Sequence, residues 1–141
     1  MKKNENGRSM VEMLGVLAII GILSVTGIIG YTIAMRKYHA NEIAQAISML
    51  AVSAKTANYG AGITKDTNYT DLIEDANMPS GVESLEAKGD ENGFKKQIIL
   101  ETKSDSDLCQ AVANIFGENE NNPLYVSVNN CEGYELTIGT K

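Results

Sequence analysis

The feature that most constrains this 141-residue chain is an uninterrupted apolar run close to its N-terminus. Residues 13–35 are 23 residues without a formal charge, rich in Ile, Leu, Val, Ala and Gly. As a helix, a run of this length extends roughly 34 Å, which is enough to cross the hydrocarbon core of a bilayer. We therefore expect a membrane-spanning helix over residues 13–35.

The apolar run is longer than that of an ordinary secretory signal, which has about 7–15 residues, and no Ala-x-Ala cleavage site follows it. After Arg36 and Lys37, residues 41–57 carry aliphatic and small side chains at helical spacing, namely Ile43, Ile47, Leu50, Ala51 and Ala54. The spacing predicts that one long helix continues through this stretch. We therefore expect that the apolar run is not removed as a signal peptide. It forms the first half of the long helix, and the second half of that helix faces water.

The residues around the start of the run resemble the type IV prepilin signature. A short basic leader ends at Gly7, and Arg-Ser-Met-Val-Glu12 follows it. With Arg8 counted as the first mature residue, the family's usual Glu, Gly, Tyr and basic positions are filled by Glu12, Gly21, Tyr31 and Lys37. The resemblance implies cleavage between Gly7 and Arg8 by a prepilin peptidase, followed by N-methylation of Arg8. Arg8 stands where Phe is common in the family.

Glu12 is the residue expected to direct assembly. A charged side chain within hydrocarbon costs roughly 2.5–3.5 kcal/mol on insertion scales, so such a carboxylate is a candidate functional group. The resemblance implies its partner, the α-amino group that cleavage creates on the neighbouring subunit. The alternative is that Glu12 lies at the headgroup level of a plain anchor, four residues from Arg8, and needs no partner.

Residues 58–141 are predicted to form a small soluble head. Asn58 to Gly62 suggests the end of the long helix, because Gly is favoured just after a helix. Turn signals and apolar patterns then predict two short helices, Tyr69–Ala76 and Ser104–Phe116, and four strands, Val82–Ala87, Phe94–Glu101, Leu124–Asn129 and Tyr134–Ile138. The expected fold class is α+β, pilin-like, with the exposed half of the long helix packed on a small antiparallel sheet. The expected division is a leader (1–7), the long helix (8–57) and the head (58–141).

The head shows a second, looser resemblance, to type IVb pilins. It is carried by Tyr-Thr-Asp-Leu-Ile73, Met-Pro-Ser-Gly81, Gly-Phe94 and Asp-Leu-Cys109. That group includes the subunits of toxin-coregulated and conjugative thin pili, and its leaders are usually longer than seven residues. The resemblance of the leader to type IV prepilins, together with the pair of cysteines, implies a head outside the bacterial inner membrane before assembly and on the cell surface afterwards. The distribution of basic residues favours this orientation only weakly, because basic residues lie on both sides of the apolar run.

The two cysteines, Cys109 and Cys131, both lie in the head. In a cytosolic protein they would usually be free thiols, whereas in an exported domain they can pair. We expect a disulfide between them, with Cys109 on the second short helix and Cys131 between the last two strands. Such a bond would contribute on the order of 3 kcal/mol in the chain-entropy model.

Composition argues against several functions. The net charge is −6, and no cluster of Lys and Arg provides the basic surface that nucleic-acid binding needs. His39 is the only histidine, so the chain has no Ser/His/Asp set. Asp105 and Asp107 precede or begin a predicted helix, where Asp usually caps rather than binds calcium. We expect no enzyme activity, no cofactor and no metal.

The sequence-based hypothesis is a structural subunit that polymerises with itself and with other pilins through its first helix, after residing in membrane lipid. A close alternative is a pseudopilin of a type II secretion or DNA-uptake system, which has the same N-terminus but different partners. An alternative of another class is a monomeric, membrane-anchored binding module, for which no cleavage at Gly7 and a tolerated Glu12→Ala are expected. Nothing in the sequence separates major from minor subunits.

Overall fold

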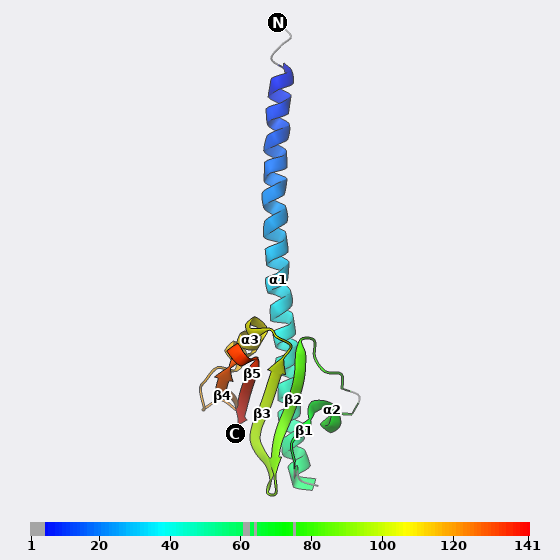
Figure 1. The fold of residues 1–141 in the computed structure, drawn as a ribbon, viewed down its shortest axis with the longest axis vertical. Coiled ribbons are helices and arrows are strands. Elements are labelled where there is room, and N and C mark those ends of the chain that lie inside the picture. The colour runs from blue at the N-terminus through cyan, green and yellow to red at the C-terminus, as the bar shows by residue number, and fades with distance from the viewer. Residues whose placement is uncertain (1–4, 61–62, 64, 75) are drawn as a thin grey trace. The chain divides into compact units, whose positions relative to one another are not determined.

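The computed structural model describes residues 5–60, 63, 65–74 and 76–141, and for residues 5–8 and 58–60 it describes the backbone alone. The chain divides into two compact units, Met1–Met35 and Arg36–Lys141. The described part of the first unit is entirely helical, and the second unit holds every strand that the structure describes (Figure 1).

Helix α1 (Glu5–Gly60) runs through both units. It begins within the predicted leader, of which residues 1–4 lie outside the described part of the chain. Its last described residue, Gly60, lies within the predicted stop signal, whose residues 61 and 62 are outside the described part. The division at Gly7 and Arg8 therefore remains a prediction.

The head contains a five-stranded antiparallel sheet. Its strands are β1 (Thr67–Asn68), β2 (Val82–Asp90), β3 (Gly93–Thr102), β4 (Leu124–Asn130) and β5 (Glu135–Thr140), in the spatial order β1-β2-β3-β5-β4. Helix α2 (Tyr69–Leu72) follows β1, helix α3 (Ser106–Phe116) joins β3 to β4, and the 3-10 helix η1 (Cys131–Gly133) joins β4 to β5. The α+β class is confirmed.

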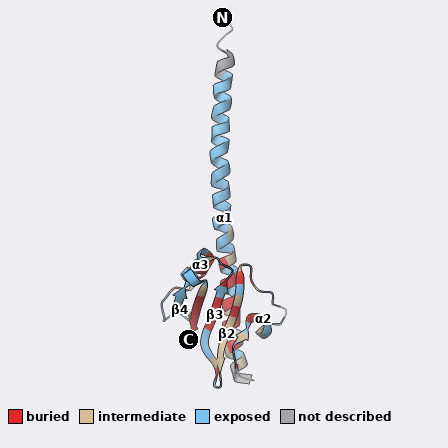
Figure 2. Cartoon of the chain, viewed as in Figure 1, coloured by how far each residue is buried: buried red, intermediate tan, exposed pale blue. Residues whose placement is uncertain are grey.

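The core of the head lies between the sheet and the second half of α1. All five residues of the predicted helical pattern are buried there: Ile43, Ile47, Leu50, Ala51 and Ala54. They share one cluster with Leu85 of β2, Leu100 of β3 and Leu136 of β5, each fully buried. Figure 2 shows the buried residues concentrated in the strands, in α3 and in the part of α1 that packs in the head. Burying each such side chain contributes about 1.5–3 kcal/mol, so this contact holds the head together.

The sheet contains a tight turn between β2 and β3 and an irregular edge strand, β4. In the β2–β3 hairpin, the Asn92 N–H donates to Asp90 Oδ1 at 2.9 Å, and Gly93 has φ +107°, a value that favours glycine. At one edge of the sheet, β4 has a register irregularity between Val126 and Val128. Such a bulge bends an edge strand and disfavours pairing with another chain.

Two predicted helices differ from the observed ones. Helix α2 ends at Leu72 instead of Ala76, with Ile73 in an extended conformation, and residue 75 lies outside the described part of the chain. For α3, the helical spacing of apolar residues in the sequence predicts a face of Leu108, Val112, Ile115 and Phe116, but Ile115 is 45% exposed. The buried residues of α3 are Leu108, Cys109, Val112 and Ala113. The buried face thus includes Cys109, which forms the disulfide, and Ala113, and Ile115 lies at its margin.

Candidate functional site

The first candidate site is the surface of α1 in the first unit. Its large apolar side chains are about half exposed or more, from 69% at Met10 to 49% at Ile33. Figure 2 shows this stretch exposed along its length. The helix is long and apolar enough to cross a membrane, with a mean hydropathy of 2.4 in its most apolar stretch. Because exposed apolar surface on this scale is unfavourable in water, this segment requires lipid or other apolar helices around it.

The hydroxyl groups of this segment are bonded within the helix itself. Ser24 donates to the Ile20 carbonyl at 2.8 Å, and Thr32 donates to the Ile29 carbonyl at 2.9 Å. Thr26 donates to the carbonyls of Ile22 and Leu23, at 3.2 and 3.0 Å. A polar group without a partner is costly in hydrocarbon, so these bonds make the segment compatible with a membrane interior.

The predicted processing site lies at the beginning of α1. The Gly7–Arg8 bond is within its first turn, where backbone N–H groups have no intrahelical acceptor. Glu12 lies one turn further along and is exposed. Cleavage and methylation at these residues, and the assembly role of Glu12, remain predictions.

Glycines leave the surface of this segment open to close approach. A Cβ built at Gly15, Gly21, Gly27 or Gly30 would meet no other part of the structure within 4 Å, apart from neighbouring backbone of the same helix. Small residues let another helix come near the backbone, which strengthens van der Waals packing between apolar helices.

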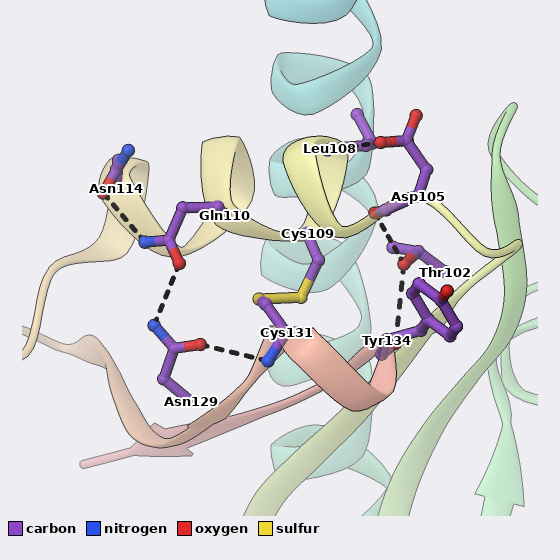
Figure 3. Close-up of a disulfide and its surroundings, with 9 residues drawn as sticks. All are labelled: Thr102, Asp105, Leu108, Cys109, Gln110, Asn114, Asn129, Cys131 and Tyr134. Atoms are coloured by element: carbon purple, nitrogen blue, oxygen red, sulfur yellow. Dashed lines mark hydrogen bonds between the residues drawn. A yellow bond between two sulfur atoms is a disulfide. The ribbon is translucent and has the colours of Figure 1, made fainter.

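The second candidate site is the disulfide region of the head (Figure 3). The predicted bond between Cys109 and Cys131 is present, with Cα atoms 5.5 Å apart, and it joins α3 to η1. Both cysteines are buried. The Thr102 hydroxyl donates to the Asp105 carbonyl at 3.0 Å, and the Thr102 N–H donates to the Tyr134 carbonyl at 2.9 Å. These bonds fix the end of β3 against the segments that carry the disulfide.

The predicted capping role of Asp105 is confirmed. Its Oδ1 accepts from the Leu108 N–H at 2.8 Å and so satisfies a donor in the first turn of α3. Asp107, also in that turn, pairs with Arg36 of α1 at 3.2 Å. Within the described residues, no group of three His, Cys, Asp or Glu side chains is placed to hold a metal ion. His39 is half-buried, with its ring against Tyr38 at a centroid distance of 5.9 Å.

The sequence analysis missed a chain of side-chain amides beside the disulfide, visible in Figure 3. Asn129 Oδ1 accepts from the Cys131 N–H at 3.2 Å, and Asn129 Nδ2 donates to Gln110 Oε1 at 3.4 Å. Gln110 Nε2 then donates to Asn114 Oδ1 at 3.3 Å. The four-residue spacing of Gln110 and Asn114 on a predicted helix was the one available signal, because such residues are neighbours on a helix surface.

An ion pair stabilises the other end of the sheet. Lys88 Nζ lies 2.7 Å from Asp66 Oδ2, and the Gly89 N–H donates to Asp66 Oδ1 at 3.2 Å. The bond from Lys88, followed by that from Gly89, lowers the pKa of Asp66 below 3.8. The bond to Asp66 raises the pKa of Lys88 above 10.5. This pair therefore stabilises the attachment of the segment before β1 to β2.

No protein-family model, no curated protein and no solved structure matches this chain.

Proposed function

We propose that this chain is the structural subunit of a type IV pilus-like filament, processed between Gly7 and Arg8 and polymerised through the first half of α1. The observation that carries the proposal is the combination of an exposed apolar helix with a disulfide-bonded head. Before assembly the apolar half lies in the membrane, and in the filament it lies against the same segment of other copies.

The proposal explains why one helix has two different surfaces. In the head, α1 buries one face against the sheet, as ordinary globular helices do. In the first unit, apolar side chains surround the helix on all sides, which suits burial in lipid or in a bundle. A subunit that moves from membrane to filament needs an apolar surface that is stable in both.

Glu12 provides the register of assembly in this proposal. The α-amino group that cleavage creates on Arg8 of one copy pairs with the Glu12 carboxylate of another. One such pairing per subunit neutralises a carboxylate in apolar surroundings and sets the axial position of each new copy.

Intact mass spectrometry tests processing directly. The protein is extracted from membranes of cells that contain a prepilin peptidase. The expected mass lacks residues 1–7, carries about 14 Da for one N-methyl group and lacks two hydrogens for the disulfide. A full-length mass would contradict the proposal and leave a monomeric, membrane-anchored module.

Electron microscopy of the same cells tests assembly. The wild-type chain is expected to form filaments, and Glu12→Ala is expected to abolish them while leaving processing intact. Glu5→Ala is the matched control, because it also removes one carboxylate but lies in the segment that processing removes. Filaments formed equally well by Glu12→Ala would refute the assembly role.

A further inference from the structure

A cavity of about 310 Å³ lies between α1 and α3, at the end of the head where α1 enters it. It is lined by Lys37, Ala40, Asn41, Ala111, Asn114 and Ile115. One cation and two amides thus share the cavity with three apolar side chains. A mixed lining of this kind suits an amphiphilic ligand with an anionic group.

The position of Lys37 in the chain places it beside a membrane surface. It follows the last residue of the uncharged run, Met35, by two residues, which is about 3 Å along a helix axis. If residues 13–35 span the hydrocarbon core, Lys37 lies at the level of the lipid headgroups. Lys and Arg at this level attract the phosphates of anionic lipids.

Lys37 differs from its neighbour Arg36 in its ion pairing. Arg36 pairs with Asp107 at 3.2 Å, so its charge is balanced within the head. Within the described part of the chain, Lys37 has no such ion pair. Residues 36–141 carry 9 basic and 16 acidic residues, a net charge of −7, and this part of the chain repels anions at long range. An anion bound at this cavity must therefore be held by local donors.

The amide chain beside the disulfide supplies such a donor. Its first bond comes from the Cys131 N–H, which can only donate, so Asn129 must accept through its oxygen. This fixes the orientation of Asn129, then of Gln110, then of Asn114, whose oxygen accepts from Gln110. Asn114 is left with an NH₂ group, which carries two N–H donors, and Asn114 is one of the residues that line the cavity.

We propose that this cavity binds the phosphate of an anionic phospholipid, with Lys37 as the charge partner and Asn114 as a hydrogen-bond donor. Lys is well suited to the charge of a phosphate, and an oriented amide adds direction. Ala40, Ala111 and Ile115 contact the less polar part of the headgroup. The inference rests on the proposed function only for the membrane anchor, and it requires neither cleavage nor filament formation.

The test is native mass spectrometry of the full chain in detergent, titrated separately with phosphatidylglycerol and phosphatidylcholine. Wild type is expected to retain phosphatidylglycerol in preference to phosphatidylcholine. Lys37→Gln is expected to lower the affinity for phosphatidylglycerol about five-fold. Asn114→Asp replaces the donor with an anionic acceptor of the same shape and is expected to lower it at least about ten-fold. Lys37→Arg is expected to keep the preference.

Two control variants separate the effect of losing the site from the effect of changing the net charge of the protein. Lys103→Gln and Asn121→Asp make the same chemical changes at exposed positions outside the cavity and are expected to leave lipid retention unchanged. Protease resistance of the head checks that each variant is folded.

Three results would overturn the inference: equal retention of the two lipids, an effect of Lys37→Gln no larger than that of Lys103→Gln, or displacement of the lipid by an equal concentration of inorganic phosphate. The last would assign the site to phosphate itself. Any of these three results would leave the outcomes of the processing and filament tests unaffected.

Discussion

Tyr125 of β4 lies directly across from Gly139 of β5, and its ring occupies the space that a side chain at position 139 would need. A Cβ built on Gly139 would lie 2.5 Å from the Tyr125 Cζ atom. Gly139 is buried, and its strand, β5, has a neighbouring strand on each side. Cross-strand pairing of an aromatic ring with glycine covers backbone that glycine alone would leave exposed.

Gly139→Ala is therefore expected to lower the free energy of unfolding by about 1–3 kcal/mol, because the Tyr125 ring must move. Urea unfolding of the full chain in a mild detergent, followed by tyrosine fluorescence, measures the change. Tyr125→Ala provides the control: in that background the same alanine has room, so its cost is expected to fall. Equal costs in the two backgrounds would show that the ring does not set the effect.

Removing the disulfide is expected to lower the stability of the head by about 3 kcal/mol, because the bond joins residues 22 positions apart in the sequence and restricts the unfolded chain. The double variant Cys109→Ala with Cys131→Ala leaves no free thiol and gives the comparison. Its unfolding midpoint should match that of the reduced wild-type chain. A midpoint equal to that of the oxidised wild type would mean that the bond adds no stability.

The Asp66–Lys88 pair predicts a small dependence of stability on pH. Because the pKa of Asp66 is lowered on folding, its contribution is present above about pH 3.8 and is lost as the pH falls through the folded pKa. Because the pKa of Lys88 is raised, the contribution is present below pH 10.5 and is lost as the pH rises through the folded pKa. The Asp66 side chain is 46% exposed, which limits the effect to about 1 kcal/mol or less.

Unfolding midpoints of wild type and Asp66→Asn across this pH range test the pair. The difference between them is expected to be constant near neutral pH and to vanish at both extremes. Glu120→Gln, which removes an exposed carboxylate in a loop, is the control and should show no such pattern. A pH-independent difference for Asp66→Asn would rule out titration as the cause.

Alanine substitutions on the two faces of α1 in the head are expected to change the free energy of unfolding by very different amounts. Ile47 is fully buried against the sheet, whereas Met49 is 53% exposed on the other side of the helix. Ile47→Ala is expected to cost about 2–5 kcal/mol through the cavity that it leaves. Met49→Ala is expected to change stability by no more than about 0.5 kcal/mol. Thermal unfolding of the two variants compares them, and similar losses would contradict the packing described.

The helical parts of this fold were predictable from sequence because their signals are local. The spacing of Ile43, Ile47 and Leu50 identified the buried face of α1, and that face is confirmed. The Asp105 cap and the pairing of Cys109 with Cys131 also followed from residue types. Ile115 was assigned wrongly to the buried face of α3, because the contacts of that helix with distant segments, including the disulfide from Cys109 to Cys131, are not visible in its local pattern.

The strand order was not predictable, because it depends on contacts between distant segments. The four expected strands are present with ends shifted by no more than three residues, but β1, with only two residues, gave no periodic signal. Nor does any local pattern indicate that β5 lies between β3 and β4. Among the candidate sites, the amide chain from Asn129 to Asn114 could not be foreseen either, since it joins a strand to a helix through side chains.

The position of β5 also determines when the head can be completed during biogenesis. Strands β3 and β4 do not pair with each other, and each pairs with β5, which follows both of them in the chain. If the head is exported as proposed, β4 has no partner in the sheet until β5 has also been exported. The sheet closes only after residue 140 has reached the same compartment as β3. A chain that lacks β5 therefore leaves both β3 and β4 with an unpaired edge, which distinguishes it from a complete one.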